Sequence, residues 1–439
     1  MTDDTFAVIG AGPSGLAAAR NLQRFGIPWS GYELAVGVGG LWDISGPRST
    51  VYESAHLISS KTTTQFTEFP MRDDVADYPS HRELLTYFRD FAAAYDLTGG
   101  FAFETEVMSA RPAGDGSWTV VSHGPEGTVE RRHAGVIAAN GTLSEPAVPT
   151  FEGSFDGEVI HTSAYKSPTV FAGKRVLIIG AGNSGCDIAV DAVHHAASVD
   201  ISVRRGYYFV PKYLFGKPAD TLNQGKPLPP RIKQAIDSRV LKAFTGDPVK
   251  FGFPKPDYKI YESHPIVNSL ILHHLGHGDL AVKPDVARFA GSAVEFKDGT
   301  SAPYDVVVLA TGYHLHYPFL EPEVLRWAGR GSAPDLYLNV FTQEDRNLFV
   351  LGMIEASGIG WQGRYEQAEL VASYLRARTT DPAAAAALER RVAGPRPDLS
   401  GGYHYLGLER MSYYVNKDAY RRAVRAEIES LGQGAGATG

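Results

Sequence analysis

Two glycine-rich loops carry the residue spacing that points most directly to chemistry. They read "GAGPSG" at residues 10–15 and "GAGNSG" at residues 180–185. Each follows a short apolar run and opens a predicted helix, which is the context in which G-x-G-x-x-G cradles a pyrophosphate. The first glycine makes the turn, the second lets the backbone approach the phosphates, and the third lets helix and strand pack closely. The loops therefore predict two dinucleotide sites, with a purely structural turn as the alternative for each.

The residues that follow each loop distinguish the two ligands. Glu33 ends the second strand after the first loop, where a carboxylate binds ribose hydroxyls and would repel a 2′-phosphate. This position predicts FAD or NAD. Arg204 and Arg205 hold the matching place after the second loop, and guanidinium groups there suit the extra phosphate of NADPH. The alternative is that these arginines lie on a solvated loop. A chain that binds both FAD and NADPH is a flavin oxidoreductase.

Composition excludes several other classes. The net charge of −7 and the lack of a basic tract argue against nucleic acid as a partner. No apolar run is long enough to span a membrane, and the N-terminus lacks the basic start of a signal peptide, so a cytoplasmic protein is expected. The single cysteine, Cys186, excludes a disulfide framework and the cysteine pair of a disulfide reductase.

The elements that position these loops predict an α/β fold. A chain of 439 residues is long enough for two domains. The strand–loop–helix–strand pattern of the first loop recurs at residues 173–205, which predicts two Rossmann-like, doubly wound dinucleotide-binding domains. We expect the NADPH domain, residues 166–309, to be inserted into the FAD domain, residues 1–165 and 310–439, which ends in C-terminal helices. Residues 207–285 are predicted to be irregular and to pack around the site.

A family resemblance lies between the two loops. Phe155, Gly157, His161, Tyr165 and Lys166 match every fixed position of FxGxxxHxxx(Y/F)(K/R), the signature of the flavin-containing monooxygenase family. The resemblance continues through "GGLW", "SSK", "FTEFP", "ESHPIVN" and "ATGYHLHYPFL", so it covers nearly the whole chain. The chain thus resembles a bacterial class B flavoprotein monooxygenase. The Tyr-Lys pair, where type I Baeyer–Villiger monooxygenases carry Trp, favours the flavin-containing monooxygenases.

The resemblance implies an activity and its partners. NADPH would reduce FAD, dioxygen would form a hydroperoxide at flavin carbon 4a, and a nitrogen or sulfur atom of a small nucleophilic molecule would take one oxygen. Baeyer–Villiger oxygen insertion into a ketone, an uncoupled NADPH oxidase and a non-catalytic FAD-binding sensor stay open as alternatives. The expected partners are the small substrate and dioxygen, with neither nucleic acid nor membrane, and a homodimer is left open.

The resemblance also implies site residues. The positions carried over for FAD are Gly10, Gly12, Pro13, Ser14, Gly15, Glu33, Gly40, Leu41, Trp42, Ser60, Thr62 and Val107. Those carried over for NADPH are Gly180, Gly182, Asn183, Ser184, Gly185, Arg204 and Arg205. Ser60, His161 and Lys166 are the candidate catalytic residues, with His161 and Lys166 near the path of the nicotinamide dinucleotide. A structural histidine at position 161 is the alternative.

Two further patterns bear on the chemistry. Many animal-type members of the family carry Asn where this chain has Ile58, beside the flavin edge at which oxygen reacts. The isoleucine side chain donates no hydrogen bond, so stabilisation of the flavin hydroperoxide must come from other groups, such as Ser59, Ser60, the cofactor's own ribose or backbone amides. The histidines of "ILHHLGHGD" at residues 271–279 lack a supporting carboxylate spacing, and no metal site is expected.

Overall fold

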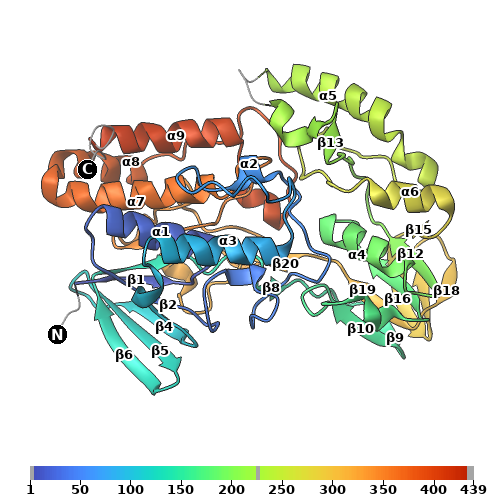
Figure 1. Ribbon diagram of the computed structural model, residues 1–439, viewed down its shortest axis with the longest axis horizontal. Helices are drawn as coiled ribbons and strands as arrows, with labels where there is room; N and C mark the ends of the chain where they lie inside the picture. The colour runs from blue at the N-terminus through green and yellow to red at the C-terminus, as the bar shows by residue number, and fades with distance from the viewer. Residues whose placement is uncertain (1–3, 224–227, 433–439) are drawn as a thin grey trace.

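Two five-stranded parallel sheets form the framework of the molecule. The computed structural model describes residues 4–223 and 228–432. The first sheet has the order β21 (Leu348–Val350), β7 (Gly135–Ala138), β1 (Phe6–Ile9), β2 (Trp29–Tyr32) and β3 (Phe101–Ala102). The second has the order β10 (Glu158–His161), β19 (Val306–Leu309), β11 (Arg175–Ile179), β12 (Ser198–Ser202) and β15 (Ala281–Lys283). The two sheets lie in different halves of the molecule (Figure 1). The expected α/β class with parallel sheets is confirmed.

The central strands are short apolar segments that are buried along their whole length. Every residue of β1, β7 and β19 is buried, as expected for parallel strands covered on both faces. Each glycine-rich loop follows a central strand directly and leads into a helix, α1 (Pro13–Arg24) or α4 (Asn183–Val193). A Cβ atom on Gly15 or on Gly185 would overlap the carbonyl oxygen of the first glycine of its loop. Close helix–strand packing therefore requires the third glycine in both loops.

The chain crosses between the two sheets through a small ladder. Strand β8 (Glu145–Pro146) leaves the first sheet, strand β20 (Tyr313–His314) returns to it, and the two pair in antiparallel orientation. Between them, β9 (Glu152–Phe155) pairs with β16 (Val286–Gly291), and β10 joins the second sheet. The domain boundary at residue 165 stays a prediction. Strand β10, which lies within the family signature, is an edge strand whose first two residues are exposed.

The remaining elements surround this framework. Strands β4 (Glu106–Pro112), β5 (Trp118–Gly124) and β6 (Gly127–His133) form an antiparallel sheet. The other strands are β13 (Tyr213–Leu214), β14 (Lys217–Pro218), β17 (Ala293–Phe296) and β18 (Ser301–Pro303). The other helices are α2 (Lys61–Thr64), α3 (His81–Ala94), α5 (Pro230–Thr245), α6 (Leu270–His277), α7 (Gln362–Thr380), α8 (Pro382–Ala393) and α9 (Lys417–Ser430). No helix within residues 4–223 and 228–432 is both long and apolar enough to cross a membrane.

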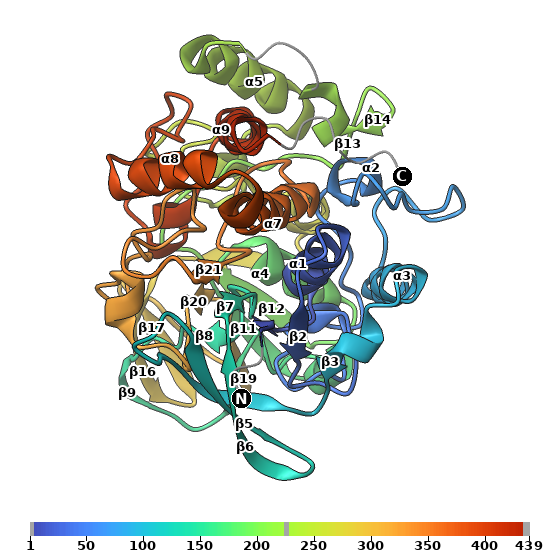
Figure 2. The same ribbon diagram turned by 90° about the vertical axis from the view of Figure 1, so that its left-hand side faces the viewer.

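The irregular conformation predicted for residues 207–285 is wrong in part. Helix α5 has 16 residues and lies at the outer edge of the molecule in both views (Figure 2). Only Gln234 and Leu241 of this helix are buried, whereas Ile232, Ile236 and Phe244 are exposed. These exposed apolar residues recur at multiples of four positions, so the apolar stripe of this helix largely faces solvent.

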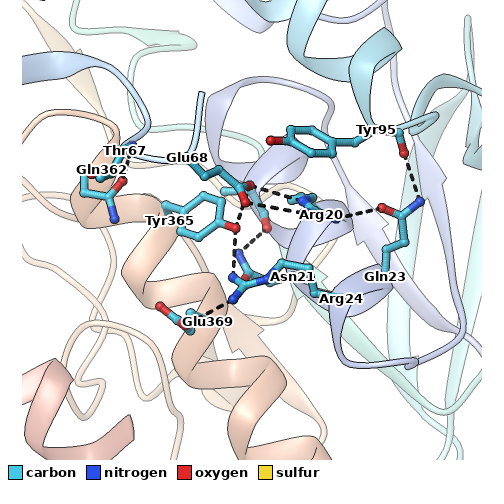
Figure 3. A network of polar contacts seen from close by, with 11 residues as sticks. Arg20, Asn21, Gln23, Arg24, Thr67, Glu68, Tyr95, Gln362, Tyr365 and Glu369 are labelled. Carbon is cyan, nitrogen blue, oxygen red and sulfur yellow. Dashed lines mark hydrogen bonds and ion pairs between the residues drawn. The ribbon is translucent and has the colours of Figure 1, made fainter. Parts of the chain in front are cut away.

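Polar contacts tie the C-terminal helix α7 to the first helix of the chain. Glu68 accepts hydrogen bonds from Arg20 at 3.2 Å and from the Tyr365 hydroxyl at 2.7 Å, and Arg24 donates to the same hydroxyl at 2.9 Å (Figure 3). The amide of Thr67 donates to the Gln362 side chain at 2.8 Å. These contacts fix the start of α7 relative to α1 and to the residues that precede it.

Candidate functional site

One cavity of about 850 Å³ connects the two glycine-rich loops. Gly10, Gly12, Pro13 and Ser14 line it from the first loop, and Gly182, Asn183, Ser184 and Gly185 line it from the second. Gly40, Leu41, Trp42 and Val107 also contribute to its wall, and their contact with FAD stays a prediction. Two segments separated by about 170 residues of chain thus meet at one internal space. This arrangement allows two nucleotide ligands to face each other.

Glu33 is held at the cavity wall by backbone amides. One of its carboxylate oxygens accepts from the Ala11 amide at 2.5 Å and the other from the Ala35 amide at 2.8 Å. Burial raises the pKa of Glu33, and these amides oppose the shift. The carboxylate therefore lies at the end of β2 beside the first loop, where ribose hydroxyls are bound in dinucleotide folds.

The cavity walls leave room for backbone to contact a nucleotide. Gly40 lies so close to the first loop that a Cβ atom on it would come within 2.9 Å of the Gly12 Cα. A Cβ atom on Gly182, in contrast, would meet no atom within 4 Å, so this backbone opens onto the cavity. The Asn183 side chain accepts from the Val267 amide at 2.7 Å and so fixes the second loop. The loops fit a dinucleotide on these grounds.

Asp187 is a cavity residue that sequence reasoning missed. It lies in α4, accepts from Asn268 at 2.6 Å and from the Tyr52 hydroxyl at 3.2 Å, and has a pKa raised by burial. Its position one turn beyond the second loop is the signal that could have identified it. The carboxylate connects the second loop to residues that lie between the two sheets.

Arg204 and Arg205 lie outside the lining of the main cavity. Arg204 lines a second space of about 450 Å³ together with Lys283. The Arg205 guanidinium lies 5.8 Å from the centre of the Tyr207 ring. Their contact with the 2′-phosphate of NADPH stays a prediction.

Ser60 and Thr62 are also absent from the lining of the main cavity. Ser60 precedes α2, and both its amide and its hydroxyl donate to Asp220, at 2.7 and 3.1 Å. The neighbouring Ile58, Ser59 and Thr64 line the cavity instead. A role for Ser60 or Thr62 beside a flavin stays a prediction.

His161 and Lys166 contact residues of the cavity wall but do not line the cavity. The His161 ring donates through Nε2 to the Gly312 carbonyl at 3.1 Å, and burial lowers its pKa. The Lys166 ammonium donates to the carbonyls of Ser49 at 2.8 Å and Val51 at 3.1 Å, and burial lowers its pKa too. Gly312, Ser49 and Val51 all line the cavity. The geometry supports a positioning role for both residues, and a catalytic role stays a prediction.

The histidine-rich stretch has a carboxylate neighbour that its sequence spacing did not suggest. Within the described residues, the potential ligand atoms of His274, His277 and Asp279 lie within 4.8 Å of one another. His274 Nδ1 lies 2.8 Å from Asp279 Oδ2. The two groups therefore satisfy each other by a hydrogen bond at the protein surface.

Comparison with known proteins identifies the family of this chain. The model of a family described as flavin-binding monooxygenase-like matches residues 3–392. The chain belongs to this family. It is 31% identical over 382 residues to flavin-containing monooxygenase 5 of Mus musculus, covering 82% of this chain and 70% of the relative. It is also 31% identical over 376 residues to flavin-containing monooxygenase 2 of Homo sapiens, covering 80% and 69%. The family resemblance is confirmed, and the chain is a flavin-dependent monooxygenase.

Solved structures share the fold. An open crystal structure of cyclohexanone monooxygenase aligns over 99% of each chain with a TM-score of 0.73 and 20% identity. A flavin-containing monooxygenase from Stenotrophomonas maltophilia aligns over 86% of this chain and 99% of its own, with a TM-score of 0.65 and 23% identity. The arrangement of parallel sheets is thus that of class B flavin monooxygenases.

Proposed function

We propose that this protein is an NADPH-dependent flavin monooxygenase that transfers one oxygen atom from dioxygen to a nitrogen or sulfur atom of a small molecule. The observation that carries the proposal is that both glycine-rich loops line one cavity. FAD and NADP are its cofactors, and a structural neighbour is described as a complex of OTEMO with FAD and NADP. FAD bound at this cavity and reduced by NADPH supplies the electrons that activate dioxygen.

The two sheets support a division of labour between the cofactors. We assign each sheet and its loop to a doubly wound dinucleotide-binding domain, with the NADPH domain inserted between β8 and β20. Amides at the start of α1 and α4 would bind the pyrophosphates, and Glu33 would accept from ribose hydroxyls of FAD. Arg204 and Arg205 would bind the 2′-phosphate of NADPH.

The rest of the chain would position the cofactors and exclude water. Trp42 and Trp361 line the cavity and contact each other edge to face, with ring centres 6.0 Å apart. Such apolar walls protect a reactive oxygen species from water. Lys166 would hold residues 49–51 in the wall, and His161 would hold the return crossing at Gly312. The side chains of this chain need supply no nucleophile.

A substrate panel tests the proposal. The FAD-loaded enzyme is given NADPH, isotopically labelled dioxygen and, in turn, a tertiary amine, a methyl thioether and a cyclic ketone. We expect label in the N-oxide or the sulfoxide, with one NADPH consumed for each product. Label in a lactone formed from the ketone would show Baeyer–Villiger insertion instead. NADPH consumption that yields only hydrogen peroxide with every substrate would contradict the proposal.

A further inference from the structure

A cluster of charged side chains lies in the cavity wall away from the two glycine-rich loops. Glu355 follows β21, Arg364 lies in the first turn of α7, and Arg410 lies in a short 3-10 helix at Glu409–Tyr413. His264 joins them from the segment before α6. All four residues line the cavity. None of them belongs to either five-stranded sheet or to a glycine-rich loop.

Of the two arginines, only Arg410 pairs with a carboxylate among the described residues. Arg410 donates to Glu355 at 3.1 Å, and 43% of the Arg410 side chain and 14% of the Glu355 side chain stay uncovered. Arg364 donates to the backbone carbonyls of Gly360 at 2.9 Å and Ile354 at 3.1 Å. Among the described residues no carboxylate lies within ion-pair distance of Arg364. The carbonyls orient this guanidinium without neutralising it.

The protonation states leave a net positive charge. Burial would raise the pKa of Glu355, but Arg410, His264 and Arg364 more than offset this and hold its pKa below the usual value, so Glu355 is ionised. Burial and the nearby Arg410 lower the pKa of His264 to about 4, so the ring is neutral at pH 7. Two guanidinium groups therefore face one carboxylate. The start of α7 adds the positive end of a helix dipole to the same place.

Two charged residues elsewhere in the wall, Arg48 and Asp237, have partners of opposite charge. Arg48 lies 3.7 Å from Glu106, and Asp237 forms an ion pair with Lys233 at 2.7 Å. By contrast, Arg364 has no carboxylate within ion-pair distance among the described residues, and His264 Nε2 is buried there without a hydrogen-bond partner. A half-buried charge without a counter-charge is stabilised by an anion beside it, so Arg364 suits an anionic ligand.

We propose that Arg410 and Arg364 bind a carboxylate group of the substrate. The substrate is then a small thioether or amine that also carries a carboxylate, an assignment that rests on the proposed function. A planar guanidinium matches a carboxylate through two parallel hydrogen bonds, which gives orientation as well as affinity. Val240 and Leu241 of α5 line the same cavity and offer apolar surface to the alkyl part of such a molecule.

Binding and turnover of a matched pair of probes test this assignment. The probes are 4-(methylthio)butanoate and its uncharged amide, and calorimetry measures their binding to the FAD-loaded enzyme. We expect the carboxylate to bind about 10- to 100-fold more tightly than the amide, because hydrogen bonds to charged groups contribute a binding free energy of this size. Arg410→Gln is expected to remove this preference. Arg48→Gln is the matched control, since this arginine lines the cavity but is paired with Glu106, and it keeps the preference. Glu355→Gln removes the neutralising carboxylate and is expected to tighten carboxylate binding.

The outcomes separate this assignment from the proposed function. Equal binding of the two probes by the unmodified enzyme would overturn the carboxylate site. So would an Arg410→Gln variant that keeps the preference but binds NADP more weakly, because the arginine would then serve the dinucleotide. If both probes become sulfoxides at equal kcat/KM, the monooxygenase function stands and the carboxylate site fails. A carboxylate preference without any NADPH-dependent sulfoxide would sustain the site and contradict the function.

Discussion

Replacing Lys166 by methionine removes the ammonium group that holds residues 49–51 in the cavity wall. The ammonium donates to two backbone carbonyls, of Ser49 at 2.8 Å and of Val51 at 3.1 Å. Ser49 and Val51 are only 6% and 5% exposed, so water has little access to carbonyls that lose this donor. Methionine has a similar length and apolar stem, and the substitution therefore tests the two hydrogen bonds rather than a cavity.

The size of the effect follows from these contacts. Hydrogen bonds to charged groups contribute about 1.5–3 kcal/mol each to stability. The cost of burying the ammonium, which lowers the pKa of Lys166, offsets part of that sum. A loss of about 2–4 kcal/mol in the free energy of unfolding is the expected net result. Because residues 49–51 line the cavity, the affinity for FAD should fall as well.

Urea unfolding of the FAD-loaded enzyme, followed by flavin fluorescence, measures both effects. Lys174→Met is the matched control, because Lys174 pairs with Glu158 where the two side chains are 39% and 50% exposed. Removal of such a surface pair costs at most about 1 kcal/mol. A Lys166→Met enzyme with unchanged stability and FAD affinity but no turnover would refute the positioning role and indicate a chemical one.

Three further substitutions test other parts of the site. Ile58→Asn adds a hydrogen-bond donor to the cavity wall, so the yield of product per NADPH should rise and hydrogen peroxide release should fall; unchanged peroxide release would argue against this role for position 58. Gly182→Val places a side chain where the second loop opens onto the cavity. Calorimetry should then detect binding of FAD but not of NADP. Retained affinity for NADP would contradict the assignment of NADP to the second loop. The pKa of His264 is about 4 in the folded chain against an ordinary value of 6.5, so between these values the unfolded chain binds more protons. The free energy of unfolding should therefore decline as the pH falls from 6.5 to 4. His264→Asn should flatten that decline, and an unchanged slope would refute the assignment of the decline to His264.

The sequence was most informative where contiguous residues decide the structure. Phe6–Ile9, the glycines that follow it and α1 form one continuous unit, so local patterns suffice to place the first loop. Strand β10 was not predicted from the sequence, because it lies at a sheet edge with Glu158 and Val159 exposed and pairs with β19, which lies far along the chain. Helix α5 was not predicted, although Ile232, Ile236 and Phe244 recur at helical spacing, and these side chains are exposed rather than packed in the core. Burial pattern, rather than length, separates these outcomes.

In the candidate site too, local sequence patterns place some residues and leave others unpredicted. Gly12, Gly182 and Glu33 line the cavity, because their positions follow from the strand–loop–helix geometry. Glu355 and Arg410 form an ion pair across 55 residues of chain, and no local pattern relates them. Arg204 lines a separate, smaller space, and its contact with NADPH stays a prediction.

The central claim is that FAD and NADPH meet in one cavity and exchange electrons there. Anaerobic titration of the FAD-loaded enzyme with NADPH, followed by flavin absorbance, tests this most directly. The claim predicts that one equivalent of NADPH bleaches the flavin fully and that admission of dioxygen restores its colour. A protein that binds no FAD, or a bound flavin that NADPH leaves oxidised, would contradict it.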